Sequence, residues 1–125
     1  MRKISALLLL AAVAACSSTP QQAPKAATPS APGGGMPVAL TDADRAVIET
    51  GVGARVGTGA TFRTMAAQRD QSGAVAVCGY VNTGGSDAPY IGMLAGGAFT
   101  VTDLGGPPER TIAVQQACQA RRIYI

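Results

Sequence analysis

The sequence predicts a small α+β domain: an N-terminal helix and a short C-terminal helix packed on one face of an antiparallel sheet of about four strands. Three observations predict this class. Residues 41–56 and 111–122 have helical composition, and residues 61–104 alternate between short apolar runs and turn residues. Residues 38–125 are also too few for more than one domain.

The first helix is expected to open at Thr41, a good N-cap residue, with Asp42 and Asp44 in the first turn, where the helix dipole favours negative charge. Glycines weaken helices and favour their ends, so Gly57 and Gly59 are expected to stop it. The expected apolar stripe comprises Ala43, Val47 and either Val52 or Ala54.

The middle of the chain reads as strands and turns. Residues 61–69 have mixed polarity, residues 70–73 are turn residues, and residues 74–82 give the clearest strand pattern, so this stretch predicts a hairpin. Two further short strands are expected at 90–94 and 99–104. In the 74–82 strand the side chains divide between two faces, with Val75, Val77 and Val81 on one and Cys78 and Tyr80 on the other.

The C-terminal helix is expected over residues 111–122, with Val114, Ala117 and Cys118 on one face. Residues 123–125 either extend this helix or pair at a sheet edge. Arg121 and Arg122 are expected to offset the helix dipole, and a docking patch is the alternative.

Residues 1–15 have the pattern of a secretory signal, with Arg2 and Lys3 before an apolar stretch too short to span a membrane. Residues 13–16 (Val-Ala-Ala-Cys) match a bacterial lipobox, which predicts a lipoprotein signal peptide and a lipidated Cys16. Two or three acyl chains give durable anchoring. Ser17 follows the cysteine, and the resemblance to enterobacterial lipoproteins then implies sorting to the outer membrane, with the domain facing the periplasm. The alternative is an ordinary secretory signal with a chance cysteine.

Residues 16–37 are expected to form a disordered tether, because a stretch rich in Pro, Ala and Gly with one charge buries too little apolar surface to fold. A Pro-rich recognition segment is the alternative. Residues 38–125 are then the folded domain.

Charge and composition exclude several function classes. Three of the ten basic residues precede residue 38, so seven remain beside seven acidic residues, and the domain is neutral. No basic patch supports nucleic-acid binding. The chain has no His, which excludes His-based catalysis and His-ligated metal sites. No cofactor is predicted: the glycines at 51, 53 and 57 have the wrong spacing for a dinucleotide loop and follow a helix.

Cys78 and Cys118 are the two cysteines left once Cys16 carries lipid. An even pair in an oxidising compartment predicts a disulfide between them. A redox pair is the alternative, although it usually has C-x-x-C spacing, which is absent.

Phe62-Arg63, Gly73, residues 77–82 (VCGYVN), residues 90–92 (YIG), Phe99 and the late Cys118 together resemble a family of small exported proteobacterial proteins. That family has an N-terminal helix, an "FR" strand, a VCG-x-VN strand, a GY-x-G turn and a late cysteine. The resemblance covers residues 45–120 and implies the fold and the disulfide. No activity is assigned to that family, so the resemblance implies no catalytic residue. Residues 83–98 depart from its pattern.

Asn82 and Tyr90 are the candidate binding residues, as two side chains of one shared surface groove. The alternatives are that Asn82 satisfies backbone groups at a strand end and that Tyr90 belongs to the core. A catalytic carboxylate pair among Asp87, Asp103 and Glu109 has no spacing to support it.

These observations together predict a membrane-anchored envelope lipoprotein and no enzyme. Its domain is expected to be a non-catalytic module that meets an unknown protein or peptidoglycan partner in the periplasm. The alternative is a periplasmic inhibitor of a wall-degrading enzyme or a small-ligand-binding lipoprotein, in which the 83–98 loop recognises the enzyme or the ligand.

Overall fold

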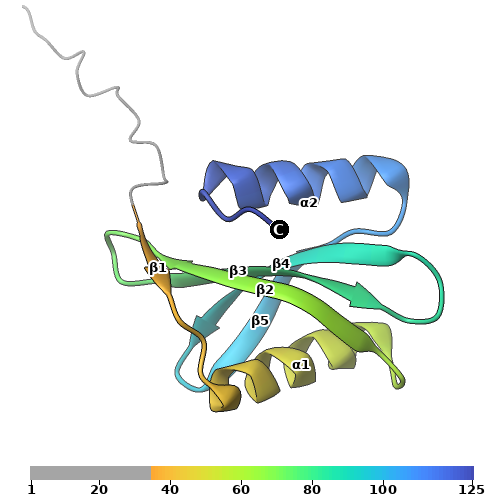
Figure 1. Ribbon diagram of the computed structural model, residues 1–125, viewed down its shortest axis with the longest axis horizontal. Helices are drawn as coiled ribbons and strands as arrows, with labels where there is room; N and C mark the ends of the chain where they lie inside the picture. The colour runs from red at the N-terminus through yellow and green to blue at the C-terminus, as the bar shows by residue number, and fades with distance from the viewer. Residues whose placement is uncertain (1–34) are drawn as a thin grey trace, which may run out of the picture.

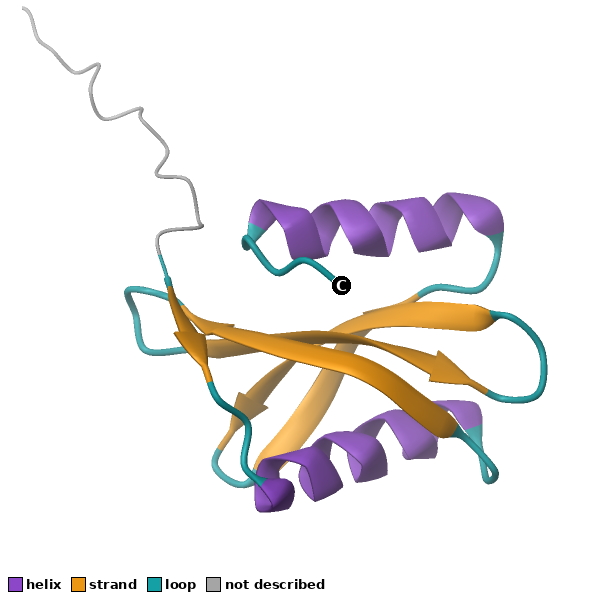
Figure 2. Cartoon of the chain, in the orientation of Figure 1, coloured by secondary structure: helices purple, strands orange, loops and turns teal. Residues whose placement is uncertain are grey.

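A computed structural model describes residues 35–125, so the predicted signal peptide, Cys16 and the tether up to residue 34 lie outside the described residues. The described chain forms three layers. Helix α1 (Asp42–Val56) covers one face of a sheet, and helix α2 (Pro108–Ala120) covers the other (Figures 1 and 2).

The sheet is a meander of five antiparallel strands in chain order, so the α+β class and the antiparallel sheet are confirmed. The predicted strand number is wrong, and so is the assignment of residues 36 and 37 to the tether. These two residues lie in an extra strand, which pairs with the end of the 61–69 strand. The strands are β1 (Met36–Val38), β2 (Thr61–Arg69), β3 (Val75–Asn82), β4 (Asp87–Ala95) and β5 (Ala98–Leu104).

The prediction that both helices cover one face is wrong, because the central strands are apolar on both sides. Val77 and Val81 of β3 pack with Ile48 and Val52 of α1, while Cys78 packs on the opposite face. That second cluster also contains Val114, Cys118, Ile123, Ala76 and Ile91. A sheet apolar on both faces needs cover on both, so the two helices lie on opposite sides.

The disulfide between Cys78 and Cys118 is confirmed, with its Cα atoms 6.2 Å apart. Both cysteines are fully buried, and the bond links β3 to α2 across a sequence separation of 40 residues. It therefore holds α2 on the face opposite α1.

Capping residues and a proline set the ends of the two helices. Thr41 caps α1 by a reciprocal capping box: Asp44 N donates to its hydroxyl (3.1 Å) and its own N–H donates to the Asp44 carboxylate (2.9 Å). The backbone N–H and the hydroxyl of Thr41 both donate to the Asp44 carboxylate and hold its pKa below the usual value. Gly57 closes α1, while α2 begins at Pro108, earlier than expected, and ends at Ala120.

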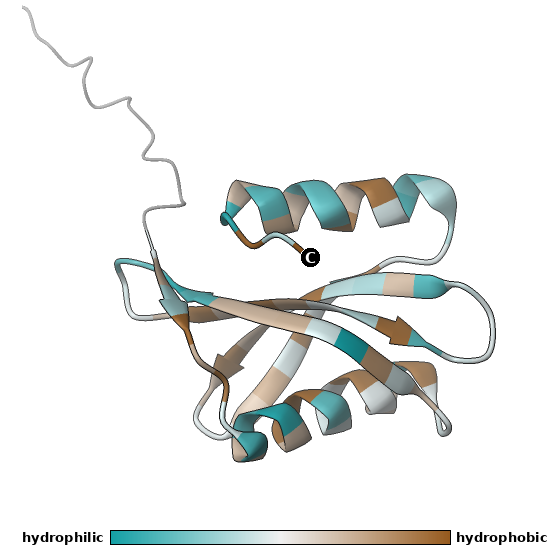
Figure 3. Ribbon diagram, viewed as in Figure 1, coloured by the Kyte–Doolittle hydropathy of each residue, from teal (hydrophilic) through white to brown (hydrophobic). Residues whose placement is uncertain are grey.

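The chain after α2 turns back over the sheet. Residues 123–125 neither extend the helix nor pair with a strand, and Ile123 is buried on the α2 side. Apolar residues of this segment stand out in the hydropathy colouring (Figure 3).

The turn at 70–73 is confirmed: Asp70 N donates to Ala74 O, and the Asp70 carboxylate accepts from Ser72 N at 2.8 Å.

Candidate functional site

Tyr90 lies in the core and is not part of a binding surface. It is 0% exposed, on the α1 side of β4, and its ring makes edge contacts with Phe62 and Phe99 at centroid distances of 6.4 and 6.1 Å. Burial raises the pKa of its phenol well above the ordinary value of 10.0. The proposed surface shared by Asn82 and Tyr90 is therefore wrong for Tyr90.

Asn82 organises the turn between β3 and β4. Its amide nitrogen donates to Gly85 O and to the Asp87 carboxylate, each at 2.8 Å, and its amide oxygen accepts from Gly84 N at 2.7 Å. These bonds match the alternative interpretation, in which Asn82 forms hydrogen bonds with backbone groups at the end of a strand.

The region 83–98 is not a loop. Residues 87–95 form β4, paired on both sides with β3 and β5. Only short connections remain at 83–86 and 96–97. Residues 83–98 therefore do not form the long recognition loop expected for an inhibitor or small-ligand binder.

Two of the acidic residues considered for a catalytic pair each meet a different arginine. Asp87 lies 3.3 Å from Arg63, and Asp103 lies 3.2 Å from Arg110. In the described part of the chain, no group of three His, Cys, Asp or Glu residues is placed to hold a metal ion.

The most distinctive surface is a groove of about 450 Å³ at the edge of the sheet, which we name the edge groove. β1 pairs only with residues 67–69 of β2, so the outer edge of β2 over residues 61–66 has no partner strand among residues 35–125. On such an edge, every second residue directs its N–H and C=O away from the sheet. The groove is lined by Pro37, Val38, Ala39, Leu40, Arg45, Met65, Ala66, Ala67, Gln68, Arg122, Ile123 and Tyr124.

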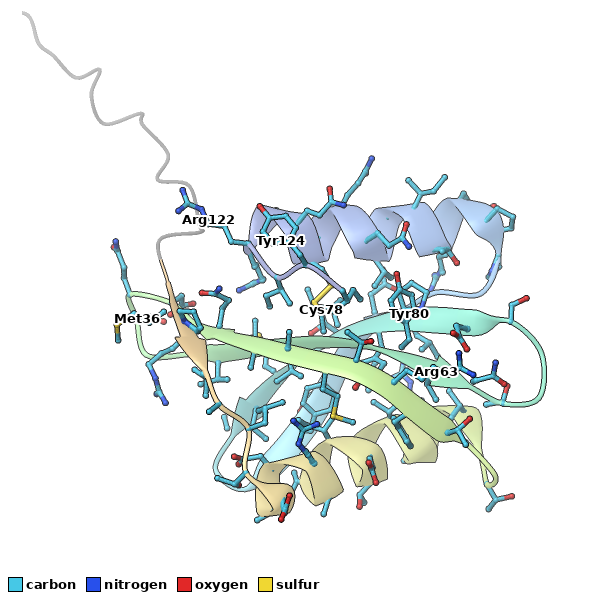
Figure 4. The ribbon with its side chains drawn as sticks, viewed as in Figure 1. Met36, Arg63, Cys78, Tyr80, Arg122 and Tyr124 are labelled. Carbon is cyan, nitrogen blue, oxygen red and sulfur yellow. A yellow bond between two sulfur atoms is a disulfide. The ribbon has the colours of Figure 1, made fainter. Side chains whose placement is uncertain are left out.

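A second pocket, of about 160 Å³, shares Ile123 and Tyr124 with the edge groove. Gln115 on α2 reaches across it and donates to the hydroxyl of Tyr80 at 3.0 Å. Tyr124 is 72% exposed, although it belongs to both linings. Figure 4 shows Arg122 and Tyr124 beside the end of α2, and Met36 on β1 nearby in that view. An exposed aromatic between two hollows is a good contact group for a partner.

Both non-glycine residues with positive φ in the described chain lie along this edge. Thr64 (φ 45°) is the extra residue of a β-bulge in β2, and Arg122 (φ 59°) follows α2 and lines the groove. Such backbone is costly for side chains other than glycine, and strain of this kind gathers at functional sites.

The conformation of Arg122 belongs to a Schellman motif, in which glycine is the usual residue. Arg122 N donates to Gln119 O at 2.8 Å, and Ile123 N donates to Cys118 O at 2.9 Å. Gln68 of β2 then donates to the Arg122 carbonyl at 3.3 Å, while its own Oε1 is buried without a hydrogen-bond partner among the described residues. The groove thus holds an unused acceptor beside an arginine on strained backbone.

Another hollow, of about 350 Å³, lies between α1 and β5 and is lined only by small or apolar residues. It contains no charged group and so gives no indication of ligand chemistry. Its lining is Ala46, Val47, Thr50, Gly51, Gly97, Ala98 and Phe99.

Sequence reasoning did not find the edge groove, although it considered Arg121 and Arg122 as a docking patch. The usable signal was Arg122, an arginine where a helix normally ends in glycine, with the aromatic Tyr124 two positions later. The groove also depends on where β1 stops, which no pattern in a three-residue strand reveals.

No known protein family, curated protein or solved structure matches this chain. The resemblance to small exported proteobacterial proteins therefore stays a prediction. Among residues 35–125, no helix has the length and apolar character needed to cross a membrane.

Proposed function

We propose that this chain is a lipid-anchored protein of the bacterial envelope, facing the periplasm, and that its domain is a non-catalytic binding module. The module holds a short, extended segment of a partner protein in the edge groove. The lipobox at residues 13–16 supports the anchor. The buried Cys78–Cys118 disulfide fits an oxidising compartment.

The observation that carries the binding role is that residues 65 and 66, on the unpaired edge of β2, line a groove. Where β1 stops at Val38, Met65 and Ala66 of β2 line the groove together with Arg45 of α1 and residues 122–124 after α2. Recognition of an extended segment by a sheet edge combines main-chain hydrogen bonds with side-chain contacts in flanking hollows. The bulge at Thr64 interrupts the edge, so it favours a short segment and disfavours the long flat pairing that leads to aggregation.

In-cell photocrosslinking tests the binding role. A photoreactive phenylalanine derivative replaces Tyr124 in one variant and Ile112 in a control. Ile112 is also exposed (54%) and lies on α2, which the disulfide holds, but it is outside both hollows. We expect one dominant protein adduct at position 124 and none at 112. Equal labelling at the two positions, or no adduct above background, would contradict the proposal.

Metabolic labelling with radioactive palmitate tests the anchor separately. The unchanged protein is expected to carry label in the membrane fraction, and the Cys16→Ser variant is expected to lose both label and membrane association. If the variant stays labelled, Cys16 is not the acylated residue. If neither protein is labelled, the signal is an ordinary secretory one.

A further inference from the structure

The charges in the edge groove are of one sign, although the described chain is balanced. Residues 35–125 contain seven arginines and seven acidic residues, yet the groove lining includes Arg45 and Arg122 and no acidic residue. The ion pairs of the described residues are Arg63–Asp87 and Arg110–Asp103, so neither groove arginine is within 4.0 Å of a carboxylate there. A segment that fills this groove meets two arginines that have no carboxylate within 4.0 Å among the described residues.

The two arginines come from opposite layers. Arg45 belongs to α1, and Arg122 follows α2, so they approach the free edge of β2 from opposite faces of the sheet. Side chains of an extended segment lying along that edge alternate between the same two faces. A side chain that faces Arg122 and one that faces Arg45 are therefore an odd number of positions apart.

The backbone at Arg122 adds an independent reason to assign this side chain a role. Glycine occupies this position of a Schellman motif without strain, whereas arginine is held at φ 59°. Arginine therefore stands at a position where the backbone alone favours glycine.

We infer that the partner segment carries two carboxylates an odd number of positions apart, one bound by Arg122 and the other by Arg45. This inference rests on the proposed binding role and names the chemistry of its ligand. Guanidinium–carboxylate pairs combine charge with directional hydrogen bonds, so they give specificity to a segment too short for extensive backbone pairing.

Selection from a random hexapeptide library, displayed on phage, tests the inference on the intact, disulfide-bonded protein in detergent. We expect selected peptides to contain Asp or Glu at two positions one or three apart, and not two apart. Synthetic versions of a selected peptide, with each acid replaced by its amide, are expected to bind about tenfold more weakly, the loss of about one charge-assisted contact.

Three protein variants assign each carboxylate to its arginine. Arg122→Gln is expected to remove the preference for one acid, and Arg45→Gln the preference for the other. Arg55→Gln is the control, since Arg55 is exposed on α1 but does not line the groove. Unchanged melting temperatures show that each variant is folded.

The possible failures are distinguishable. Peptides that compete with the adduct at position 124 but show no preference for acids would overturn this inference and leave the binding role standing. No selected peptide and no adduct at position 124 would overturn both. Arg122-dependent binding of purified cell-wall sacculi, or of phosphatidylglycerol vesicles, in place of peptides would assign the groove to the wall or to lipid and overturn the inference.

Discussion

Gly79 and Tyr90 are partners across β3 and β4, and the Tyr90 side chain occupies the space that any side chain at residue 79 would need. A Cβ atom at residue 79 would lie 2.7 Å from Cζ of Tyr90 and 2.8 Å from the carbonyl oxygen of Thr64. Real Cβ contacts are not this short. The Tyr90 ring, the bulge at Thr64 and the missing side chain at Gly79 therefore form one packing unit.

Gly79→Ala is expected to destabilise the domain by about 2–3 kcal/mol, because neither the buried ring nor the backbone carbonyl has room to move. Urea unfolding measures the change. Gly53→Ala is the matched control: no atom lies within 4 Å of its Cβ, and it sits inside α1, so alanine is expected to stabilise by about 0.5–1 kcal/mol. A neutral Gly79→Ala would show that Tyr90 packs differently.

Tyr90→Phe is expected to stabilise the domain at neutral pH by about 1 kcal/mol. The Tyr90 hydroxyl is buried and has no hydrogen-bond partner among the described residues, so phenylalanine removes an unsatisfied group and keeps the ring. Urea unfolding at pH 7 measures the gain, with Tyr124→Phe as the exposed control. Equal or lower stability for Tyr90→Phe would mean that the hydroxyl has a partner.

The same residue is expected to make stability fall in alkali. Burial, and then the negative charge of Glu49, raise the pKa of Tyr90 in the folded state. Above about pH 10 the unfolded chain therefore loses this proton while the folded chain keeps it, so the free energy of unfolding decreases as pH rises. Tyr90→Phe is expected to flatten this loss when unfolding is followed from pH 8 to 11. A slope identical to that of the parent would contradict the burial of the phenol.

Replacing both Cys78 and Cys118 by alanine is expected to cost about 3–4 kcal/mol, from the chain entropy of a loop of this length. Alkylation of the oxidised protein, followed by mass measurement, is expected to find neither thiol free. Thermal unfolding of parent and variant measures the loss. Equal melting temperatures would mean that the packing of Val114 and Ile123 alone holds α2 on the sheet.

Arg122→Gly is expected to stabilise the domain by about 1 kcal/mol, because glycine relieves the positive φ at this position. Arg121→Gly is the control, since Arg121 has φ −97° and gains no such relief. Chemical unfolding compares the two variants. A loss of stability in Arg122→Gly larger than in the control would show that the arginine is there for the fold and not for a partner.

The elements with local patterns could be predicted from the sequence. The alternation in residues 74–82 placed Val77 and Cys78 on opposite faces, and the turn residues at 70–73 placed the hairpin. The disulfide followed from counting cysteines. The strand faces and the hairpin depend on residues adjacent in the chain. The disulfide depends on the even number of cysteines left once Cys16 carries lipid.

The remaining features depend on contacts between distant residues. β1 exists because residues 36–38 pair with the end of β2, and three residues show no period. The placement of helices on two faces was implicit in the division between Val77 and Cys78, since each face needs its own cover. The expected loop over 83–98 was wrong because the strand predicted at 90–94 extends over residues 87–95. β4 accommodates Pro89 in a buried position and Gly92 beneath the ring of Phe99.

Amide hydrogen exchange of the intact protein, alone and bound to the partner captured at position 124, tests the edge groove most directly. We predict slower exchange in residues 65 and 66, which line the groove and have no β1 partner, and in residues 122–125 of the complex. Exchange in residues 98–101, on the opposite edge of the sheet, is expected to stay unchanged. Protection confined to residues 98–101, or no protection at residues 65 and 66, would contradict a partner segment bound in the edge groove.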